Sequence, residues 1–144
     1  MRIVIDADGC PVVRIAVDCA KRRNIEPILV CDSAHFFDIE GVQTITVTKG
    51  ADSADFRIVN MIAKGDIVIT QDYGLAAMSL ARNALVINQN GMIYHDGNID
   101  SLLLARHTAR KIRNSGGRLK GPSKRTKEQD DAFLCTLEKL ISQI

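Results

Sequence analysis

Short runs of apolar and β-branched residues alternate with longer amphipathic segments along most of the chain. Runs of this kind are typical of strands that are buried on both faces of a parallel sheet. The longer segments between them have the length and pattern of helices. Five strands are therefore predicted at residues 3–5, 28–31, 44–47, 67–70 and 85–88, with helices near residues 11–23, 54–64 and 74–82.

This alternation predicts an α/β fold with three layers, α/β/α, around a mostly parallel sheet. Because crossovers between parallel strands are right-handed, the strands share one direction and their carboxyl ends lie at one edge. We expect the strand order 3-2-1-4-5, in which the first and fourth strands are neighbours. Open sheets of this type bind their ligands at the carboxyl ends of the strands.

The last third of the chain changes pattern. Asn90-Gly91 lies between two apolar runs and signals a hairpin, so a short antiparallel strand is expected at the edge of the sheet. A helix capped by Asn98 and ending near Arg113 is expected next. Residues 114–127 are rich in glycine and basic residues, and we expect a loop there.

A final helix is predicted over residues 127–143. Thr126 and Gln129 have the spacing of a capping box at its start. The helix must dock its apolar face on the body of the protein or on a second subunit, so a homodimer is one of two expectations. The side chains of that face are Phe133, Leu137, Leu140 and Ile144.

Length and composition restrict the class of protein. A chain of 144 residues with 46% hydrophobic residues suits a single domain, residues 1–144. No apolar run approaches the roughly 20 residues of a membrane-spanning helix, and no secretory segment is recognisable, so a cytoplasmic protein is expected. The four cysteines form no C-x-x-C pair and have no histidine at metal-ligand spacing, which argues against zinc.

The formal net charge of +2 conceals two regions of opposite sign. Residues 1–105 contain 9 Lys and Arg against 13 Asp and Glu, a net charge of −4, whereas residues 106–144 contain 10 against 4, a net charge of +6. Such a basic region can neutralise the phosphates of RNA or single-stranded nucleic acid, although a solvated loop is the alternative. The candidate nucleic-acid-binding residues are Arg106, Arg110, Arg113, Arg118, Lys120, Lys124 and Arg125.

Aspartates follow the predicted strands at the edge where a ligand would bind. Asp6 and Asp8 come directly after the first strand, and Asp72 follows the fourth. Carboxylates so close repel each other unless a cation lies between them or one is protonated. The structural alternatives are an Asx turn or helix cap for Asp8 and a helix cap for Asp72. Asp66 lies at the opposite end of the fourth strand and is predicted to be structural.

Asp52 and Asp55 precede the second predicted helix. They are either a capping pair or further members of the same cluster, because the third strand ends at the same edge. Several converging carboxylates without histidine or thiolate form an all-oxygen site, which suits Mg²⁺ or Mn²⁺ and the hydrolysis of phosphodiesters. The candidate metal ligands are Asp6, Asp8, Asp52, Asp55 and Asp72.

Four segments resemble the bacterial YaiI/YqxD family, and the resemblance covers nearly the whole chain in the same order. They are Ile-Val-Ile-Asp-Ala-Asp-Gly-Cys-Pro-Val-Val at residues 3–13, residues 49–55, Gly-Asp-Ile-Val-Ile-Thr-Gln-Asp-Tyr-Gly-Leu-Ala-Ala at residues 65–77, and residues 116–122. The resemblance implies a PIN-like domain. The active members of the PIN-like group are metal-dependent nucleases.

The resemblance also implies which acids are catalytic. By position, the PIN-like acids fall on Asp6, on Asp55 with Asp52 one turn earlier, and on Asp72. The fourth acid of that pattern has no counterpart just after Asp72, and Asp8 is the candidate to replace it. The implied activity is cleavage of RNA or single-stranded nucleic acid with Mg²⁺ or Mn²⁺.

Two other functions remain open. Asp6-Ala7-Asp8-Gly9 is similar to the D-x-D motif of haloacid-dehalogenase-like phosphatases, where Asp6 would be the nucleophile and Asp8 the general acid/base. Asp66 and Asp72 would then have to share one end of a strand, but the fourth predicted strand separates them. The third alternative is a protein that binds nucleic acid without cleaving it, with the aspartates capping helices.

Overall fold

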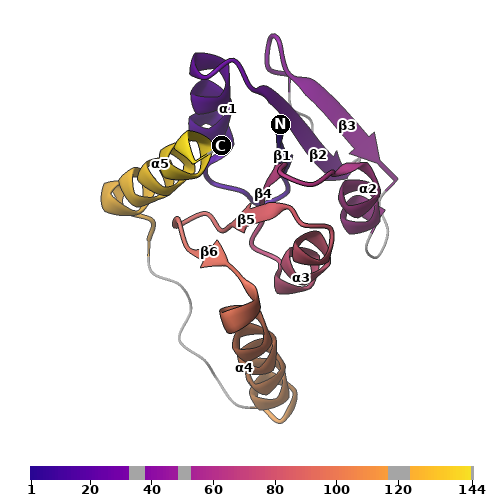
Figure 1. The fold of residues 1–144 in the computed structure, drawn as a ribbon. Coiled ribbons are helices and arrows are strands. Elements are labelled where there is room, and N and C mark those ends of the chain that lie inside the picture. Colours follow the sequence, from indigo (N-terminus) through magenta and orange to yellow (C-terminus); the bar gives the residue numbers. More distant parts are fainter. Residues whose placement is uncertain (33–37, 49–52, 117–123, 144) are drawn as a thin grey trace.

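The computed structural model describes residues 1–32, 38–48, 53–116 and 124–143. These residues form a six-stranded sheet with the order β3-β2-β1-β4-β5-β6 (Figure 1). Five strands are parallel, and β6 is antiparallel to β5, which confirms the predicted α/β class, strand order and edge hairpin. The strands are β1 (Arg2–Asp6), β2 (Glu26–Asp32), β3 (Gln43–Val47), β4 (Ile67–Ile69), β5 (Leu85–Ile87) and β6 (Ile93–Tyr94).

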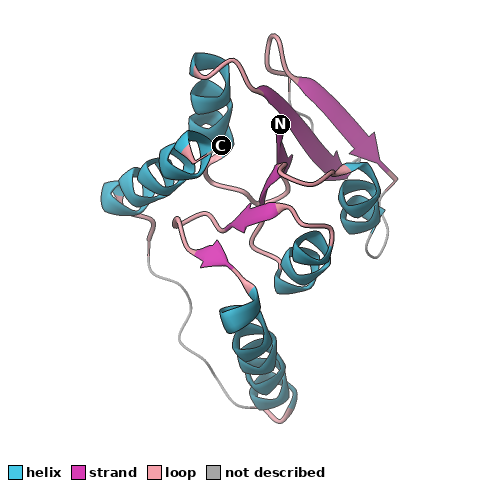
Figure 2. Cartoon of the chain, in the orientation of Figure 1, coloured by secondary structure: helices cyan, strands magenta, loops and turns pink. Residues whose placement is uncertain are grey.

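Helices cover both faces of the sheet and complete the three layers (Figure 2). α1 (Val13–Arg22) and α5 (Lys127–Ser142) pack on one face, and α2 (Ser53–Met61) and α3 (Tyr73–Ala81) pack on the other. α4 (Asp96–Asn114) begins beside α3 and then projects away from the sheet (Figure 1). No helix in the described ranges is long and apolar enough to cross a membrane.

The two cores follow from the two-residue period of the strands. In β1, Ile3 and Ile5 belong to the core under α1 and α5, whereas Val4 belongs to the core under α2 and α3. Val4 lies between Ile28 of β2 and Val68 of β4, which belong to the same core as Val4. Because both faces are covered, the strands have apolar residues at consecutive positions, as the sequence pattern indicated.

α5 docks its apolar face on α1 within the same chain. Phe133 and Leu137 are fully buried, and Leu140 is nearly so. The predicted capping box is present, since Thr126 Oγ1 accepts a hydrogen bond from Gln129 N (3.3 Å) and Gln129 Oε1 accepts one from Thr126 N (2.9 Å). Docking on the body is therefore confirmed, whereas the homodimer stays a prediction.

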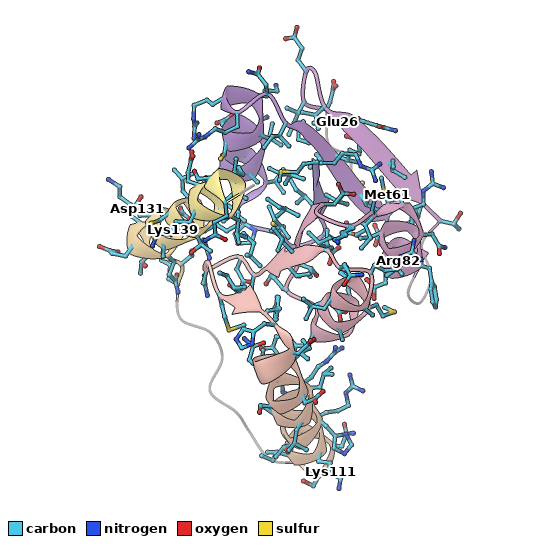
Figure 3. All side chains as sticks on the ribbon, in the orientation of Figure 1. Glu26, Met61, Arg82, Lys111, Asp131 and Lys139 are labelled. Atoms are coloured by element: carbon cyan, nitrogen blue, oxygen red, sulfur yellow. The ribbon has the colours of Figure 1, made fainter. Side chains whose placement is uncertain are left out.

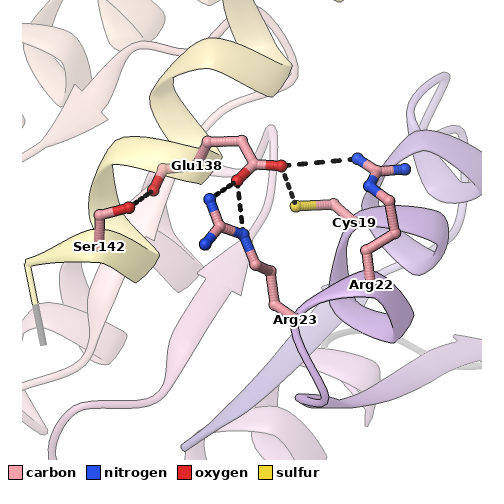
Figure 4. Close-up of polar contacts among 5 residues, drawn as sticks. All are labelled: Cys19, Arg22, Arg23, Glu138 and Ser142. Atoms are coloured by element: carbon pink, nitrogen blue, oxygen red, sulfur yellow. Dashed lines mark hydrogen bonds and ion pairs between the residues drawn. The ribbon is translucent and has the colours of Figure 1, made fainter.

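A polar contact joins the same two helices (Figure 4). Glu138 of α5 accepts hydrogen bonds from Nε of Arg23 (2.7 Å), from Arg23 Nη2 and from Sγ of Cys19 (3.4 Å). Arg22 Nη2 lies 3.5 Å from the same carboxylate. The hydrogen bonds from Arg23 hold the pKa of Glu138 below its usual value. The C-terminal helix α5 therefore contacts α1 through ion pairs and hydrogen bonds as well as through apolar side chains.

α4 begins earlier than predicted, and the prediction that Asn98 is its cap was wrong. His95 is the N-cap, and its Nδ1 accepts a hydrogen bond from Gly97 N (3.0 Å). Asn98 is the third helical residue, and its Oδ1 accepts a hydrogen bond from His95 N (2.9 Å). Histidine is not among the preferred capping residues, so the sequence pattern pointed to Asn98 instead. The helix also continues through Asn114, the first residue of the predicted loop.

Most of α4 is exposed. Ile99 is its one buried residue, while Leu104 and Ile112 are exposed. Figure 3 shows Lys111 at the end of the molecule farthest from the sheet. Of the predicted loop that follows, residues 117–123 lie outside the described residues, as do Asp52 and Ile144.

Candidate functional site

An open cleft of about 600 Å³ lies at the carboxyl ends of the central strands. The sheet grows from β1 toward β2 and β3 on one side and toward β4 and β5 on the other, and such a switch point is the usual ligand site of open α/β sheets. The predicted site residues Asp6, Asp8, Asp55 and Asp72 lie in this cleft together. Its lining residues are Asp6, Asp8, Gly9, Asp32, Val47, Ala54, Asp55, Gln71, Asp72, Tyr73 and Arg106.

Thr70 connects the two central acids. This buried residue follows β4, and its Oγ1 donates a hydrogen bond to Oδ2 of Asp6 (2.8 Å) and accepts one from the backbone N of Asp72 (3.0 Å). Asp72 is also the N-cap of α3, because its Oδ1 accepts a hydrogen bond from Leu75 N (3.1 Å). Asp72 therefore caps α3 and also lines the cleft. From the sequence, these two roles were alternatives.

The environment of Asp6 disfavours its charged form. Burial raises the pKa of Asp6 from 3.8 to about 6. The hydrogen bond from Thr70 opposes this rise, whereas the negative charges of Asp8 and Asp72 add to it. Asp6, Asp8 and Asp72 therefore interact through their charges, and a cation in the cleft would relieve their repulsion.

Asp8 points toward the neighbouring strand β2. Its Oδ2 accepts a hydrogen bond from the backbone N of Asp32 (2.9 Å), the last residue of β2. The N-cap of α1 is Val12, and no side chain caps that helix, so Asp8 is not a helix cap. The hydrogen bond instead holds Asp8 at the edge of the cleft, where Asp32 is a fifth acid.

Asp32 was missed by the sequence reasoning, although a signal was present. It directly follows the strand predicted at residues 28–31, which is the position that identified Asp6 after the first strand. Gln71 was also missed, and its Nε2 donates a hydrogen bond to the backbone O of Gly9 (2.9 Å). No sequence motif marked that contact, because it joins residues 62 positions apart.

Asp55 reaches the cleft from a third element. It lies in the first turn of α2 and is partly buried. A negative charge is favourable at this position because the N-terminus of a helix carries a partial positive charge. Asp52, predicted one turn earlier, lies outside the described residues.

Asp66 lies at the opposite edge of the sheet, as predicted. It accepts hydrogen bonds from Arg2 N (3.0 Å), from Arg2 Nη2 (2.9 Å) and from Ala63 N (2.8 Å). Burial acts to raise the pKa of Asp66, but these hydrogen bonds outweigh it and lower the pKa below its usual value. β4 separates Asp66 from Asp72, so the two do not form the paired acids that the phosphatase alternative requires.

Arg106 enters the cleft from α4. Its Nη1 lies 3.4 Å from Oδ1 of Asp72, and it is the one basic side chain that lines the cleft in the described part of the chain. Arg106 also lines a second hollow, of about 280 Å³, together with Leu103, His107 and Arg110. Two of the predicted nucleic-acid-binding residues, Arg106 and Arg110, therefore lie next to the acidic cleft.

The other predicted basic residues have different surroundings. Arg113 and Lys124 are exposed, and Arg118 and Lys120 lie outside the described residues. The guanidinium of Arg125 donates to Asp130 Oδ1 (2.6 Å), to Asn90 Oδ1 (2.7 Å) and to the backbone O of Gln89 (2.6 Å). These contacts join the start of α5 to the turn between β5 and β6, so Arg125 has a structural role.

The donor chemistry of the cleft fits Mg²⁺ or Mn²⁺, since the acids offer carboxylate oxygens and, among the residues that the structure describes, no histidine or cysteine lines it. Both hydrogen bonds to the Asp72 carboxylate reach Oδ1, and within the described residues none reaches Oδ2. No three Asp, Glu, His or Cys side chains in those ranges are already gathered as a complete ligand set. Mg²⁺ needs no such set, because it usually takes one or two carboxylates together with waters and substrate phosphates.

Comparison with known proteins places the chain in a family. Among solved structures, a mutant of Rae1 (YacP) from Bacillus subtilis is similar over the full length of both chains, with a TM-score of 0.49 and 15% identity. A UPF0178 protein from Exiguobacterium sibiricum is 50% identical over 143 residues, 99% of this chain and 98% of the relative. Another, from Ruminiclostridium cellulolyticum, is 50% identical over 133 residues, 92% of this chain and 87% of the relative. The sequence model described as "Uncharacterized BCR, YaiI/YqxD family" matches residues 4–143, and the chain therefore belongs to the YaiI/YqxD family.

Proposed function

We propose that the protein is a metal-dependent nuclease that hydrolyses phosphodiester bonds of RNA or another single-stranded nucleic acid. The observation that carries this proposal is the meeting of Asp6, Asp8, Asp55 and Asp72 in one open cleft with Arg106 at its side. Acids from three separate elements share this cleft, whereas Asp66 is paired within the chain at the other edge. An acidic, all-oxygen site beside a basic helix suits a reaction at phosphate.

Each acid has a separate part in this proposal. Asp6 and Asp72 would hold the metal, and Thr70 would position them, because its hydroxyl contacts the carboxylate of Asp6 and the backbone N of Asp72. Asp8, which follows β1, and Asp55 of α2 would bind the ion or the waters on it. Bound there, Mg²⁺ or Mn²⁺ would lower the pKa of a water and neutralise charge on the phosphate.

Tyr73 supports a single-stranded substrate. Its ring lines the cleft beside Asp72 and is partly exposed. The ring packs edge-on against the buried Tyr94, with 6.0 Å between centroids and an interplanar angle of 65°. An unpaired base bound in the cleft would stack on this ring, and stacking of this kind is tolerant of base identity. Bases in a duplex are already stacked and would not be available.

The test is cleavage of a single-stranded RNA in the presence of Mn²⁺ by wild type and by Asp72→Asn. Asparagine caps helices as well as aspartate does, so α3 is retained while the carboxylate is lost. Asp18→Asn is the matched control, because Asp18 is an exposed acid on α1 away from the cleft. Loss of cleavage in Asp72→Asn alone supports the proposal, and equal cleavage by all three proteins overturns it.

The same assay separates the alternatives. A phosphatase would release inorganic phosphate from monoesters and would lose this activity in Asp6→Asn. A binding protein without catalysis would retain RNA in a salt-dependent manner and cleave none of it in any variant. Either result would replace the nuclease proposal.

A further inference from the structure

Arg106 has two sets of neighbours, and together they suggest what it does. On one side its guanidinium faces Asp72 across the cleft, at 3.4 Å. On the other side it forms part of the hollow on α4 with Leu103, His107 and Arg110. These four residues have the spacing of one helix face, so the hollow continues the cleft along α4. Beyond this point α4 projects from the body, which leaves the face open to a ligand (Figure 1).

The ion pair between Arg106 and Asp72 is weak enough to exchange. Both side chains are substantially exposed, 44% for Arg106 and 35% for Asp72, and exposed ion pairs contribute little stability. A phosphate, by contrast, can accept two parallel hydrogen bonds from a guanidinium, which is a stronger and more specific contact. Arg110 lies one turn further along the same face, at a step comparable to that between neighbouring phosphates of an extended strand.

We propose that Arg106 is a phosphate-responsive latch, which pairs with Asp72 in the free protein and moves to a backbone phosphate of a single-stranded nucleic acid in the complex. This inference rests on the proposed function, because the strand that it binds is the substrate of the acidic cleft. Arg110 holds the next phosphate in the hollow on α4. Release of Asp72 then leaves that carboxylate for the cation, so substrate binding and metal binding assist each other.

If Arg106 acts in this way, its removal should change the affinities for nucleic acid and for the cation in opposite directions. Loss of Arg106 removes a phosphate contact, so nucleic acid binds less tightly. It also removes a positive charge that competes for Asp72, so a divalent cation binds more tightly. A residue that merely maintained the shape of the cleft would weaken both interactions, or neither.

The experiment compares wild type, Arg106→Ala and Arg82→Ala. Arg82 is exposed at the C-terminus of α3, at the opposite edge of the sheet, and its replacement removes the same charge. Binding of a short fluorescent single-stranded RNA is measured by anisotropy in EDTA, where no cleavage occurs, over a range of salt concentrations. Binding of Mn²⁺ alone is measured by calorimetry. Circular dichroism of each protein confirms folding, and Arg106→Lys provides a second variant that keeps the charge.

The latch predicts that Arg106→Ala binds the RNA about tenfold more weakly, with a salt slope smaller by about 0.7, since each phosphate contact to a single strand contributes that amount. Arg106→Ala also binds Mn²⁺ about threefold more tightly, as expected when a neighbouring positive charge is removed. The affinities of Arg106→Lys for RNA and Mn²⁺ lie between those of wild type and Arg106→Ala. Arg82→Ala has the wild-type affinity for both. Wild-type RNA affinity and slope in Arg106→Ala, or weaker binding of both RNA and Mn²⁺, overturns the latch.

The result is independent of the cleavage assay. If wild type cleaves RNA but Arg106→Ala binds RNA as wild type does, the latch is wrong and the nuclease proposal stands. If Arg106→Ala shows both opposite shifts but Asp72→Asn cleaves as well as wild type, the nuclease proposal is wrong and the phosphate contact stands.

Discussion

The two ends of β4 carry aspartates in opposite situations. Asp66, just before the strand, is buried and accepts three hydrogen bonds from Arg2 and Ala63, which lower its pKa. Thr70 and Asp72, just after it, face Asp6, whose pKa is raised to about 6 by burial first and by the charges of Asp8 and Asp72 in addition. At one edge, the carboxylate of Asp66 is paired with a basic side chain of the same chain. At the other edge, several carboxylates lie together, and a bound cation would stabilise their charged forms.

The comparison teaches that the number of acids says little about function. Asp66 and Asp72 are six residues apart and flank the same three-residue strand. What differs is the partner that each carboxylate meets, a basic side chain and backbone donors on one side and further carboxylates on the other. Substitutions at the two edges should therefore have different consequences.

The largest effect is expected on cleavage by Asp6→Asn. Removal of the central carboxylate should lower the rate of Mn²⁺-dependent RNA cleavage by about 100-fold or more, because even the partners of metal ligands typically contribute 10- to 100-fold. Initial rates on one RNA substrate measure this effect. Asp18→Asn should cleave at the wild-type rate, and a similar loss in that control would show that the acids act through net charge alone.

At the opposite edge of the sheet, replacement of Asp66 should change the stability of the fold and not the activity. Asp66→Asn removes a buried charge from its ion pair with Arg2 and should lower the free energy of unfolding by about 2 to 3 kcal/mol. Urea unfolding at neutral pH measures this change. Cleavage per folded molecule should stay at the wild-type level. A loss of activity in a folded Asp66→Asn protein would contradict the division between the two edges.

Asp6 should make stability fall as the pH rises. Its pKa is about 6 in the folded protein and near 3.8 in the unfolded chain, so the folded state holds this proton more tightly. Stability therefore decreases from about pH 4 to about pH 6, and above that range the ionised carboxylate costs on the order of 2 to 3 kcal/mol. Asp6→Asn should be more stable than wild type by that amount at pH 7.5.

The measurement is urea unfolding of both proteins between pH 4 and pH 7.5. The difference in the free energy of unfolding should become small near pH 4, where Asp6 is protonated in the folded protein and the unfolded chain has begun to take up the same proton. A difference that is constant over this range would mean that Asp6 does not titrate in this way.

The smallest effect is stabilisation by the cation. At a Mn²⁺ concentration ten times its dissociation constant, the folded protein should gain about 1.4 kcal/mol of stability, because the ion binds the folded state. Thermal unfolding with and without Mn²⁺ measures this gain. Asp72→Asn should gain much less, and Asp18→Asn should gain as much as wild type. Equal stabilisation of all three proteins would place the ion outside the cleft.

Part of the site could be located from the sequence. The acids at positions 6, 8 and 72 follow predicted strands directly, and parallel strands present their carboxyl ends at one edge. Asp55 could be placed because the third strand leads into its helix at the same edge. Asp32 obeys the same rule and was overlooked, although the strand before it was predicted correctly.

Other features depended on contacts that no local pattern encodes. The last two helices were both predicted from the sequence, but α5 is buried on α1 while α4 is largely exposed. Arg106 was predicted to bind phosphate as one of a basic group, and its place opposite Asp72 arises because α4 begins beside α3. The contacts of Arg125 with Asn90 and Gln89 likewise span about 35 positions.

The α/β class, the strand order and the edge at which the acids gather could all be predicted from the sequence, because strand burial and crossover handedness follow from local pattern and chirality. Which charged groups contact each other became evident from the folded chain alone. Asp66 meets Arg2, Asp8 meets the end of β2, and Asp72 meets Arg106, each across 24 or more positions of the chain. The interaction of two charges depends on their distance and burial, and both are properties of the folded chain.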